Sequence, residues 1–574
     1  MRELFLGKLK EPFDTSKMVA PFLASFLGRE DELDEISENG LFDSGMDLDD
    51  LEKFDVDIYH ESMWMVDVLA KKYNQQIYAA HSFQFWKTLY FPWVYSCLSW
   101  LYRKQLMSDY VIRQFGDEIL YVSILDLHIN PRIETESDYF FKVDSDADVN
   151  EWILGKFIKN NLPKKWQVQH CQKNVSFSVT NADNRTPVKL VLYRLFKKWT
   201  QRTFSVYGFN VFHEVYFQLL FGLKPTIEVG ALSKPELKNR VQWKIDLEQL
   251  IDELIPQELK QLPIGTLKLR SFKKGKMINF SNTLYHNMEA KVEAAFAYEH
   301  GEVIIASQHG GHRYGSAYSN MYGKGVEFDL HYFLSWGWDK VNDESLDNVI
   351  RLPSPMLSKY LNTYQQKNNK IILVGTALKA FENIFKVSPS ESHLLGYMRM
   401  KRNYMQVLKK IGAMDSLWYR PYSSSRGFDD PGYFEQSVGD LNILEGKLHE
   451  AIQKCRLLVL DHPGTTWNIA MAMNIPTLLF WNKEAQSFNR KADEFLKEFQ
   501  ELGLYFDNPE KAAKKTEELT REGFDTWKWW NSTEIQSLRQ RWMQEYGLAD
   551  KNWLKIWTKT LWKIGQPLKD IARN

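Results

Sequence analysis

The sequence predicts an α/β protein built on parallel sheets with helices on both faces, followed by a helical tail. In the second half, apolar runs of strand length alternate with helical stretches, as at residues 370–375, 457–461 and 475–481. Two of the predicted strands run into loops rich in Gly, Thr or His, and ligands of open parallel sheets bind at such positions. Residues 509–574 are almost entirely helical in pattern and rich in Trp.

The expected elements follow in order along the chain. We expect helices over 58–115 and 146–161 with a strand at 118–126 between them, and then a strand at 204–208. A helix over 210–222 should end at Gly222, and a helix over 286–301 should end at Gly301. Further strands are expected at 302–306 and 328–338, a loop at 350–356, and helices at 446–455 and 465–474.

Composition narrows the classes of function. Of 574 residues, 73 are Lys or Arg and 73 are Asp or Glu, whereas a nucleic-acid binder usually has a basic excess. The three Cys form no CxxC pair, so we expect no zinc site and no disulfide framework, as suits a reducing cytoplasm. No uncharged apolar run reaches the roughly 20 residues of a membrane span. Basic stretches at 192–202 and 270–276 would be attracted to an anionic leaflet, which allows peripheral contact with the inner membrane.

The loop SQHGGHRYG, residues 307–315, follows a predicted strand directly. Gly310 and Gly311 let the backbone approach a ligand and present N–H groups to an anion. His309 and His312 suit acid–base chemistry near neutral pH or donation to a phosphate oxygen. Arg313 and Tyr314 are further donors, and the alternative is a tight turn with exposed histidines.

The stretch DHPGTTWN, residues 461–468, follows a second strand and opens a helix. A helix N-terminus presents unpaired N–H groups and the positive end of the helix dipole, which together suit a phosphate. We therefore predict an anion site at Gly464, Thr465 and Thr466, with His462 as a cation beside it. The alternative is that Thr465 only caps the helix. The sequence has neither GxxxxGK[ST] nor GxGxxG, which argues against a P-loop NTPase and a dinucleotide-binding fold.

Two weaker candidates flank this stretch. Arg420 precedes a turn-forming Pro, and a guanidinium can bind a phosphate or carboxylate through two donors. Trp481 and Arg490 follow the last predicted strand and are expected to line the same crevice.

Together these motifs resemble those of a family of transferases found in bacterial surface-carbohydrate and O-antigen biosynthesis loci. The resemblance is strong over residues 305–542 and thin in the first 50 residues. The matching motifs are SWGW (335–338), WYRPY (418–422), PGTT and NIPTLLFW (463–481), RKADEF (490–495), GLYFDNPEKAAKK (503–515), the pair Trp529 and Trp530, and in the N-terminal half KKYNQQ (71–76), FW (85–86) and FPW (91–93).

The resemblance implies a GT-B-like glycosyltransferase, in which two Rossmann-like domains face a cleft. It implies an acceptor-side domain with helical insertions over 1–335, a nucleotide-donor domain over 336–508, and a helical tail over 509–574 that packs back on both. The expected partners are a nucleotide sugar and a glycan or lipid-linked acceptor, in the cytoplasm. The pair His462–Pro463 is similar to motifs of enzymes that use CMP-activated acid sugars or CDP-glycerol, so a cytidine nucleotide donor is one expectation.

The resemblance also assigns roles. We expect Gly464, Thr465 and Thr466, supported by His462 and Arg420, to stabilise the leaving phosphate without a metal or other cofactor. His309 is the first choice for the base, Glu327 the second and Glu214 the third. Asn468 is placed in the nucleotide site, and the position where the family often has a ribose-binding Glu is Ile469. A CDP-polyol phosphotransferase and a catalytically degenerate binding scaffold are the alternatives.

Overall fold

The computed structural model describes residues 2–7, 18–19, 48–77, 80–129, 133–175, 204–232, 234–236, 240–262, 272–280, 283–341, 344–376, 381, 391–422, 429–483 and 486–564. The basic stretch 192–202 lies outside these residues, and so does part of 270–276.

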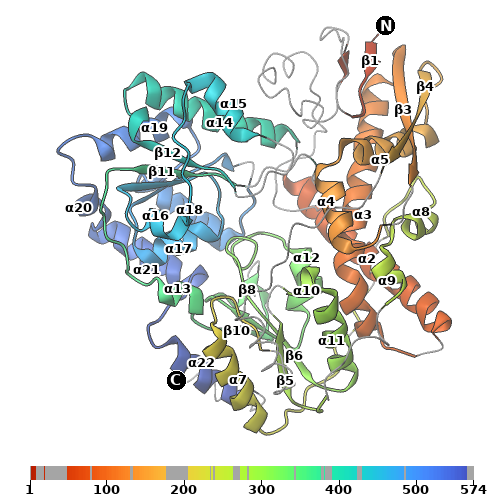
Figure 1. Ribbon diagram of the computed structural model, residues 1–574, viewed down its shortest axis with the longest axis horizontal. Coiled ribbons are helices and arrows are strands. Elements are labelled where there is room, and N and C mark those ends of the chain that lie inside the picture. Colours follow the sequence, from red (N-terminus) through yellow and green to blue (C-terminus); the bar gives the residue numbers. More distant parts are fainter. Residues whose placement is uncertain are drawn as a thin grey trace.

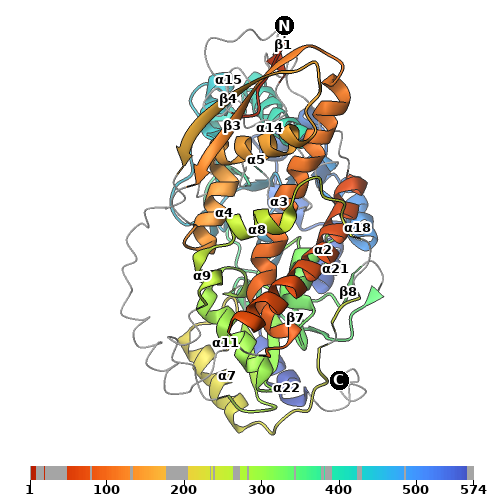
Figure 2. The ribbon, with the colours of Figure 1, turned by 90° about the vertical axis from the view of Figure 1, so that its right-hand side faces the viewer.

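Three parallel sheets organise the described residues (Figure 1). The N-terminal sheet has the strand order β2-β1-β3-β4, the central sheet β10-β7-β6-β5, and the C-terminal sheet β12-β11-β13-β14-β15. A short antiparallel pair, β8-β9, lies apart from them. Two long helices, α2 and α3, run along the height of the molecule beside the first two sheets (Figure 2).

The N-terminal third contains β1 (Arg2–Leu4), β2 (Met18–Val19), α2 (Leu48–Gln76), α3 (Phe83–Phe115), β3 (Leu120–Ile129), α4 (Glu136–Ser145), α5 (Ala147–Asn160) and β4 (Gln167–Val175). The central part contains α7 (Val211–Leu223), α8 (Leu247–Leu254), α9 (Gln257–Lys260), β5 (Met277–Phe280), α10 (Thr283–His286), α11 (Met288–Glu299), β6 (Val303–Ser307), α12 (Met321–Gly323), the π-helical turn η5 (Lys324–Phe328), β7 (Tyr332–Ser335), β8 (Lys340–Val341), β9 (Glu344–Ser345), β10 (Val349–Arg351) and α13 (Pro355–Lys359).

The C-terminal sheet and its helices comprise β11 (Ile371–Val374), α14 (Glu391–Lys410), η6 (Met414–Ser416), β12 (Leu417–Arg420), α15 (Asp430–Val438), α16 (Leu448–Ile452), β13 (Leu457–Leu460), α17 (Thr465–Met473), β14 (Thr477–Phe480), α18 (Arg490–Glu501) and β15 (Tyr505–Phe506). The tail contains α19 (Pro509–Thr520), α20 (Thr526–Trp530), α21 (Thr533–Tyr546) and α22 (Trp553–Lys563).

The C-terminal sheet is buried on both faces, which explains its continuous apolar runs. Strand β13 alternates between two cores: Leu458 and Leu460 pack with α17 and α21, whereas Leu457 and Val459 pack with α14 and α19. All four side chains are buried. The two-sided packing makes this half of the chain a three-layer α/β unit.

The central sheet is also covered on both faces. Ile304 and Phe333 contribute to the core that includes α3 and α11. On the other face, Ile305 and Leu334 pack in one cluster with apolar residues of α7 and α22. The last helix of the chain therefore returns to the central sheet.

The predicted fold class is confirmed: two parallel sheets with helices on both faces place their carboxyl edges toward each other, in a GT-B-like arrangement with a helical tail. The β2-β1-β3-β4 sheet is an addition to that plan. Because β10 pairs with β7, the central sheet extends past residue 335. No helix in the described part of the chain is long and apolar enough to cross a membrane.

Several local predictions were wrong. Phe204 makes only an isolated bridge to Asn279 instead of a strand. Gly222 lies inside α7, which Lys224 ends. The expected strand over 328–338 is confined to β7, because η5 occupies the residues just before it. The expected loop at 350–356 contains the end of β10 and the start of α13.

Candidate active site

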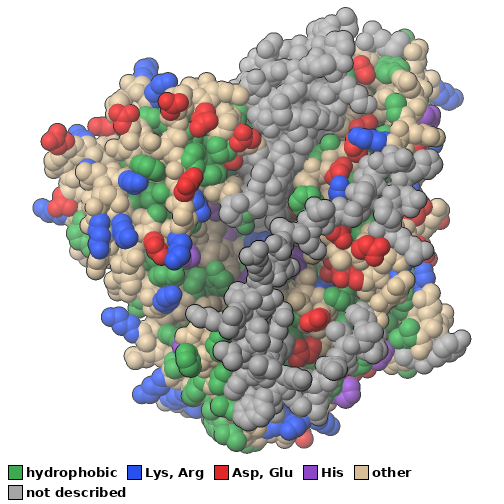
Figure 3. Space-filling model, in the orientation of Figure 1, with side chains coloured by type: hydrophobic (Ala, Val, Ile, Leu, Met, Phe, Trp, Pro, Cys, Tyr) green, Lys and Arg blue, Asp and Glu red, His purple; other side chains and the backbone are tan. Residues whose placement is uncertain are grey.

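The loop after β6 contacts the beginnings of two helices in the C-terminal half. The Gly311 N–H donates to the Thr465 hydroxyl over 3.0 Å. The Asn489 N–H, at the start of α18, donates to the Ser316 carbonyl over 3.0 Å. A Cβ on Gly311 would lie 2.9 Å from the backbone of Gly464 and Thr465, so this approach requires glycine. Figure 3 shows the molecule hollowed between its two halves on this face, with histidine side chains in the hollow.

His309 and Glu327 lie next to each other at the end of the central sheet. His309 Nδ1 lies 3.5 Å from Glu327 Oε1, the carboxyl is fully buried and the imidazole is 20% exposed. The π-helical turn η5 positions Glu327 below the loop that carries His309. The first and second choices for the base are therefore one pair, in which a buried carboxylate faces a partly exposed imidazole.

Two tyrosines fix this pair. The hydroxyls of Tyr285 and Tyr314 donate to Glu327 Oε2 over 2.8 Å and 3.0 Å. The Tyr314 oxygen also lies 2.8 Å and 2.9 Å from the two ring nitrogens of His309. Burial and the adjacent carboxylate raise the pKa of both phenols well above the usual value, so both remain donors. Tyr314 thus positions the pair. This differs from the expectation that its hydroxyl would face a ligand in the cleft.

Helix α17 begins with half-buried residues that carry uncapped donors. Gly464 is its N-cap residue in an extended conformation, and no side chain of the described residues caps the first turn. The Thr465 hydroxyl accepts from Gly311 and does not cap its own helix. The N–H groups and the hydroxyls of Thr465 and Thr466 remain as donors for an anion, whereas the Trp467 N–H donates to the Gly464 carbonyl over 3.1 Å.

A buried carboxylate, Asp461, connects His462 to Lys401. Its Nδ1 lies 2.7 Å from Asp461 Oδ1, and Lys401 Nζ lies 3.0 Å from Asp461 Oδ2. Although burial alone would raise it, Lys401 and His462 hold the pKa of the Asp461 carboxyl below its usual value. A Cβ on Gly464 would lie 2.5 Å from His462 Nε2, so the free nitrogen lies against the start of α17. This geometry suits donation from His462 Nε2 to the same anion.

Arg420 and Arg313 remain candidate cations. Arg420 ends β12 at the same sheet edge, and its Nη1 donates to the Leu444 carbonyl over 2.6 Å. Arg313 is exposed in the loop after β6, and among the described residues no acid pairs with it.

Four expected site residues, and Ile469 at the expected ribose position, lie elsewhere or act differently. Asn468 accepts from Trp542 and donates to the Tyr546 carbonyl, so its amide joins α17 to α21 and does not face a nucleotide. Trp481 is buried beside Trp467, and Ile469 is a core residue. Arg490 is 80% exposed and faces Glu494 on its own helix. Burial lowers the pKa of His312 to about 3, so it cannot act as a base near neutral pH.

Three acidic residues lie outside this contact. Asp55 accepts from Ser319 and from the Met321 N–H and so joins α2 to the central part. Asp146, in DSDAD, caps α5. Glu214 lies on α7, which packs with α22 at the far pole from the loop contact. The described residues contain no group of three or more His, Cys, Asp or Glu that could hold a metal ion.

Gln308, Tyr285 and Lys401 were missed. Gln308 accepts from the Trp336 N–H and Trp338 Nε1 and donates to the Gly310 carbonyl, which fixes the loop. It lies inside the motif SQHGGHRYG and could have been chosen there. Tyr285 and Lys401 have no local sequence signal.

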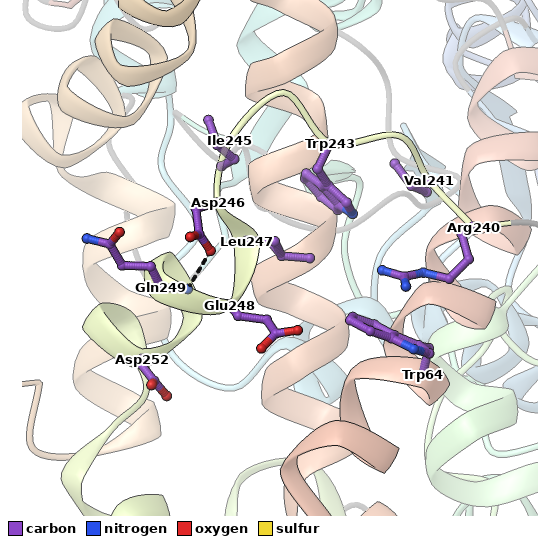
Figure 4. Close-up of a pocket in the computed structure, with 10 residues that line it drawn as sticks. All are labelled: Trp64, Arg240, Val241, Trp243, Ile245, Asp246, Leu247, Glu248, Gln249 and Asp252. Atoms are coloured by element: carbon purple, nitrogen blue, oxygen red, sulfur yellow. Dashed lines mark hydrogen bonds between the residues drawn. The ribbon is translucent and has the colours of Figure 1, made fainter. Parts of the chain in front are cut away.

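A surface cavity of about 660 Å³ lies away from this contact (Figure 4). Trp64 and Trp243 line it, and the Arg240 guanidinium stacks 3.3 Å from the Trp64 ring centre. Arg240 and Trp243 both donate to the buried Glu61. The cavity thus contains a satisfied structural ion pair and none of the predicted site residues.

Comparisons with known proteins bear on identity. Solved structures with a distant likeness include MnaA of S. aureus with UDP (9% identity, TM-score 0.33, covering 79% of this chain and 98% of that one). MurG of Acinetobacter baumannii has 10% identity and a TM-score of 0.32, covering 77% and 99%. The α,α-trehalose-6-phosphate synthase of Burkholderia multivorans has 8% identity and a TM-score of 0.31, covering 55% and 75%. No curated protein matches the chain in sequence.

Nearly the whole described fold falls within one family match. The sequence matches the LIC12162 family of transferases over residues 2–561, from β1 to near the end of α22. This match confirms the transferase family predicted from the motifs. The protein is therefore a transferase of the LIC12162 family.

Proposed function

We propose that the protein transfers a glycosyl group from a nucleotide-activated sugar to an acceptor hydroxyl. The observation that carries this proposal is the contact between the His309 loop and the N-terminus of α17. The contact brings a His–Glu pair from one sheet and an anion site from the other to the same place, as transfer between a donor and an acceptor requires.

In the proposed step, the acceptor oxygen forms the new bond to the anomeric carbon of the sugar. Its proton passes to the His309 imidazole, while the Glu327 carboxylate, 3.5 Å from His309 Nδ1, stabilises the imidazolium that forms. The bond between the anomeric carbon and the phosphate oxygen breaks, and the electron pair leaves with the nucleotide. The first-turn N–H groups of α17, Thr465, Thr466 and His462 stabilise that charge without a metal.

The finer assignments rest on the motif resemblance. We propose that the pathway is surface-polysaccharide, O-antigen or lipopolysaccharide synthesis in the cytoplasm, and that the acceptor is a glycan or a lipid-linked glycan. The pair His462–Pro463 favours a CMP-activated acid sugar as donor. The intact His309–Glu327 pair speaks against a degenerate binding scaffold, because a scaffold would have no need of a buried carboxylate beneath a histidine.

A thermal-shift panel of CMP, CDP, UDP, GDP and their sugars tests the nucleotide. Stabilisation by CMP supports acid-sugar transfer, whereas stabilisation by CDP alone supports a polyol phosphotransferase. Stabilisation by none of them would contradict the donor site. In calorimetry, Thr465→Val with Thr466→Val should weaken binding of the stabilising nucleotide at least about tenfold, since charged hydrogen bonds contribute about 1.5–3 kcal/mol each. Thr465→Ser with Thr466→Ser keeps both hydroxyls and should bind nearly as the native chain does.

A further inference from the structure

One pole of the molecule exposes an apolar helix face. On α7, Phe212, Tyr216, Leu219 and Leu223 follow a spacing of four, three and four residues, which places them on one side of the helix. All four are exposed, and Phe212 and Leu223 are 82% and 81% exposed. The opposite side of α7 buries Phe217 and Phe221 against the central sheet. A surface helix of a globular protein normally turns polar residues outward, so this face is inverted.

A basic face of α22 lies beside it. The Tyr216 hydroxyl lies 3.1 Å from the Thr558 hydroxyl, and Phe217 packs on Trp557, so the two helices are neighbours (Figures 1 and 2). Helix α22 exposes Lys555, Lys559 and Trp562. Its sequence, WLKIWTKTLWK, contains three lysines and no acid. Figure 3 shows hydrophobic and basic side chains together at this pole.

We propose that this α7–α22 face binds the surface of a membrane that contains anionic lipid. The exposed apolar residues of α7 would enter the boundary between headgroups and acyl chains, as interfacial amphipathic helices do. The lysines of α22 would lie at the anionic headgroups with their alkyl stems along the apolar surface, and Trp562 would lie at the same level. A protein partner would need acidic groups matched to the lysines, whereas an anionic bilayer offers apolar depth and negative charge together.

The α7–α22 face is separate from the candidate active site, so membrane binding there would be a property additional to the proposed reaction. It would hold the enzyme at the surface where lipid-linked acceptors lie. Vesicle binding needs no substrate, and therefore this proposal and the proposed glycosyl transfer can fail independently.

The test is co-sedimentation of the full chain with vesicles of phosphatidylglycerol and phosphatidylcholine, compared with pure phosphatidylcholine. The native chain should bind the anionic vesicles, and added salt should weaken that binding. Phe212→Ser with Leu223→Ser should abolish it. Lys555→Glu with Lys559→Glu should weaken it by at least about fivefold for each lysine lost, or at least roughly 25-fold in all, because each glutamate also adds a repelled charge.

Matched controls sit elsewhere on the surface. Phe141→Ser changes another exposed aromatic residue, on α4, and Lys511→Glu with Lys514→Glu makes the same charge change on α19. Both should bind as the native chain does. Failure of the native chain to bind anionic vesicles, or unchanged binding by the α7 variant, would overturn the proposal. A native dimer in ultracentrifugation that the α7 variant converts to a monomer, without lipid binding, would assign the face to a second copy instead.

Discussion

The Thr465 hydroxyl, at the first residue of α17, accepts a 3.0 Å hydrogen bond from the Gly311 N–H in the loop after β6. This bond, together with the one from the Asn489 N–H to the Ser316 carbonyl, joins the carboxyl edges of the central and C-terminal sheets. Two residues before Gly311 the chain carries His309, which faces the buried Glu327. The bond therefore fixes the distance between the proposed base and the proposed phosphate site.

Gly311→Ala should move the loop that carries His309 away from the start of α17. The new Cβ would lie 2.9 Å from backbone atoms of Gly464 and Thr465, so one loop must move. We expect a loss of roughly 1–3 kcal/mol in the free energy of unfolding and of about 100-fold in kcat/KM. Denaturant unfolding and steady-state kinetics measure the two.

Gly396→Ala is the control for this change, because nothing lies within 4 Å of the added Cβ. It lies inside α14, where Ala is the better helix former, so the variant should gain roughly 0.5–1 kcal/mol. A Gly311→Ala enzyme with native kinetics would show that the contact does not set the site geometry.

Glu327→Gln should lower kcat and leave the donor KM unchanged. The amide keeps the shape of the side chain but cannot stabilise an imidazolium, so we expect a loss of about 10²- to 10⁴-fold in kcat. Glu435→Gln, an exposed acid on α15, is the control. A rise in the donor KM of about 10²- to 10⁴-fold with an unchanged kcat would instead show that Glu327 acts in substrate binding.

Asn468→Ala separates a structural role from a ligand role. Its amide makes two buried hydrogen bonds to α21, at Trp542 and Tyr546, so the free energy of unfolding should fall by about 1–3 kcal/mol. Nucleotide affinity, measured by calorimetry below the unfolding temperature, should stay within about twofold of native. A tenfold loss of nucleotide affinity in the fully folded variant would show that Asn468 binds the nucleotide.

His312 should make the folded state less stable as the pH falls. Its pKa is lowered to about 3 by burial, while the unfolded chain has the ordinary value of 6.5. The unfolded state therefore binds more protons between these values, and the stability of the folded state falls as the pH falls through 6.5 toward 3. For this group alone the loss between pH 7.5 and 5 is about 2 kcal/mol.

His312→Phe removes that proton and keeps a ring against Phe488. The variant should lose less stability than the native chain between pH 7.5 and 5 in urea unfolding. Identical pH dependence of the two proteins would contradict the neutral, buried state of His312.

Sequence patterns predicted the parts of the fold that burial dictates. Three C-terminal strands, β11, β13 and β14, agree with the prediction within about two residues, because a strand buried on both faces must be apolar throughout. The outer strands β12 and β15 were not predicted. The error at Phe204 has the same origin: a short apolar run can be buried without joining a ladder, as this residue is in the cluster with α7 and α22. The period of α17 likewise could not show that α21 covers Asn468, since the contacting residues of α21 lie 74 and 78 residues later in the chain.

The candidate site was predictable where it is local. Gly311, His309 and Thr465 lie in two short loops at strand ends, and their residue types suggested their chemistry. The pairing of His309 with Glu327 depends on η5, a π-helical turn that no periodicity predicted. Lys401 lies on α14, 60 residues before Asp461 in the chain, so only the tertiary structure reveals their ion pair.

The most direct test of the account measures turnover and nucleotide binding together in His309→Ala, with the nucleotide sugar that stabilises the native chain most. Loss of the base should lower kcat about 10²- to 10⁴-fold. Nucleotide affinity by calorimetry should be unchanged, because the proposed phosphate site lies at α17 and His462. Native turnover in His309→Ala would contradict the proposed mechanism.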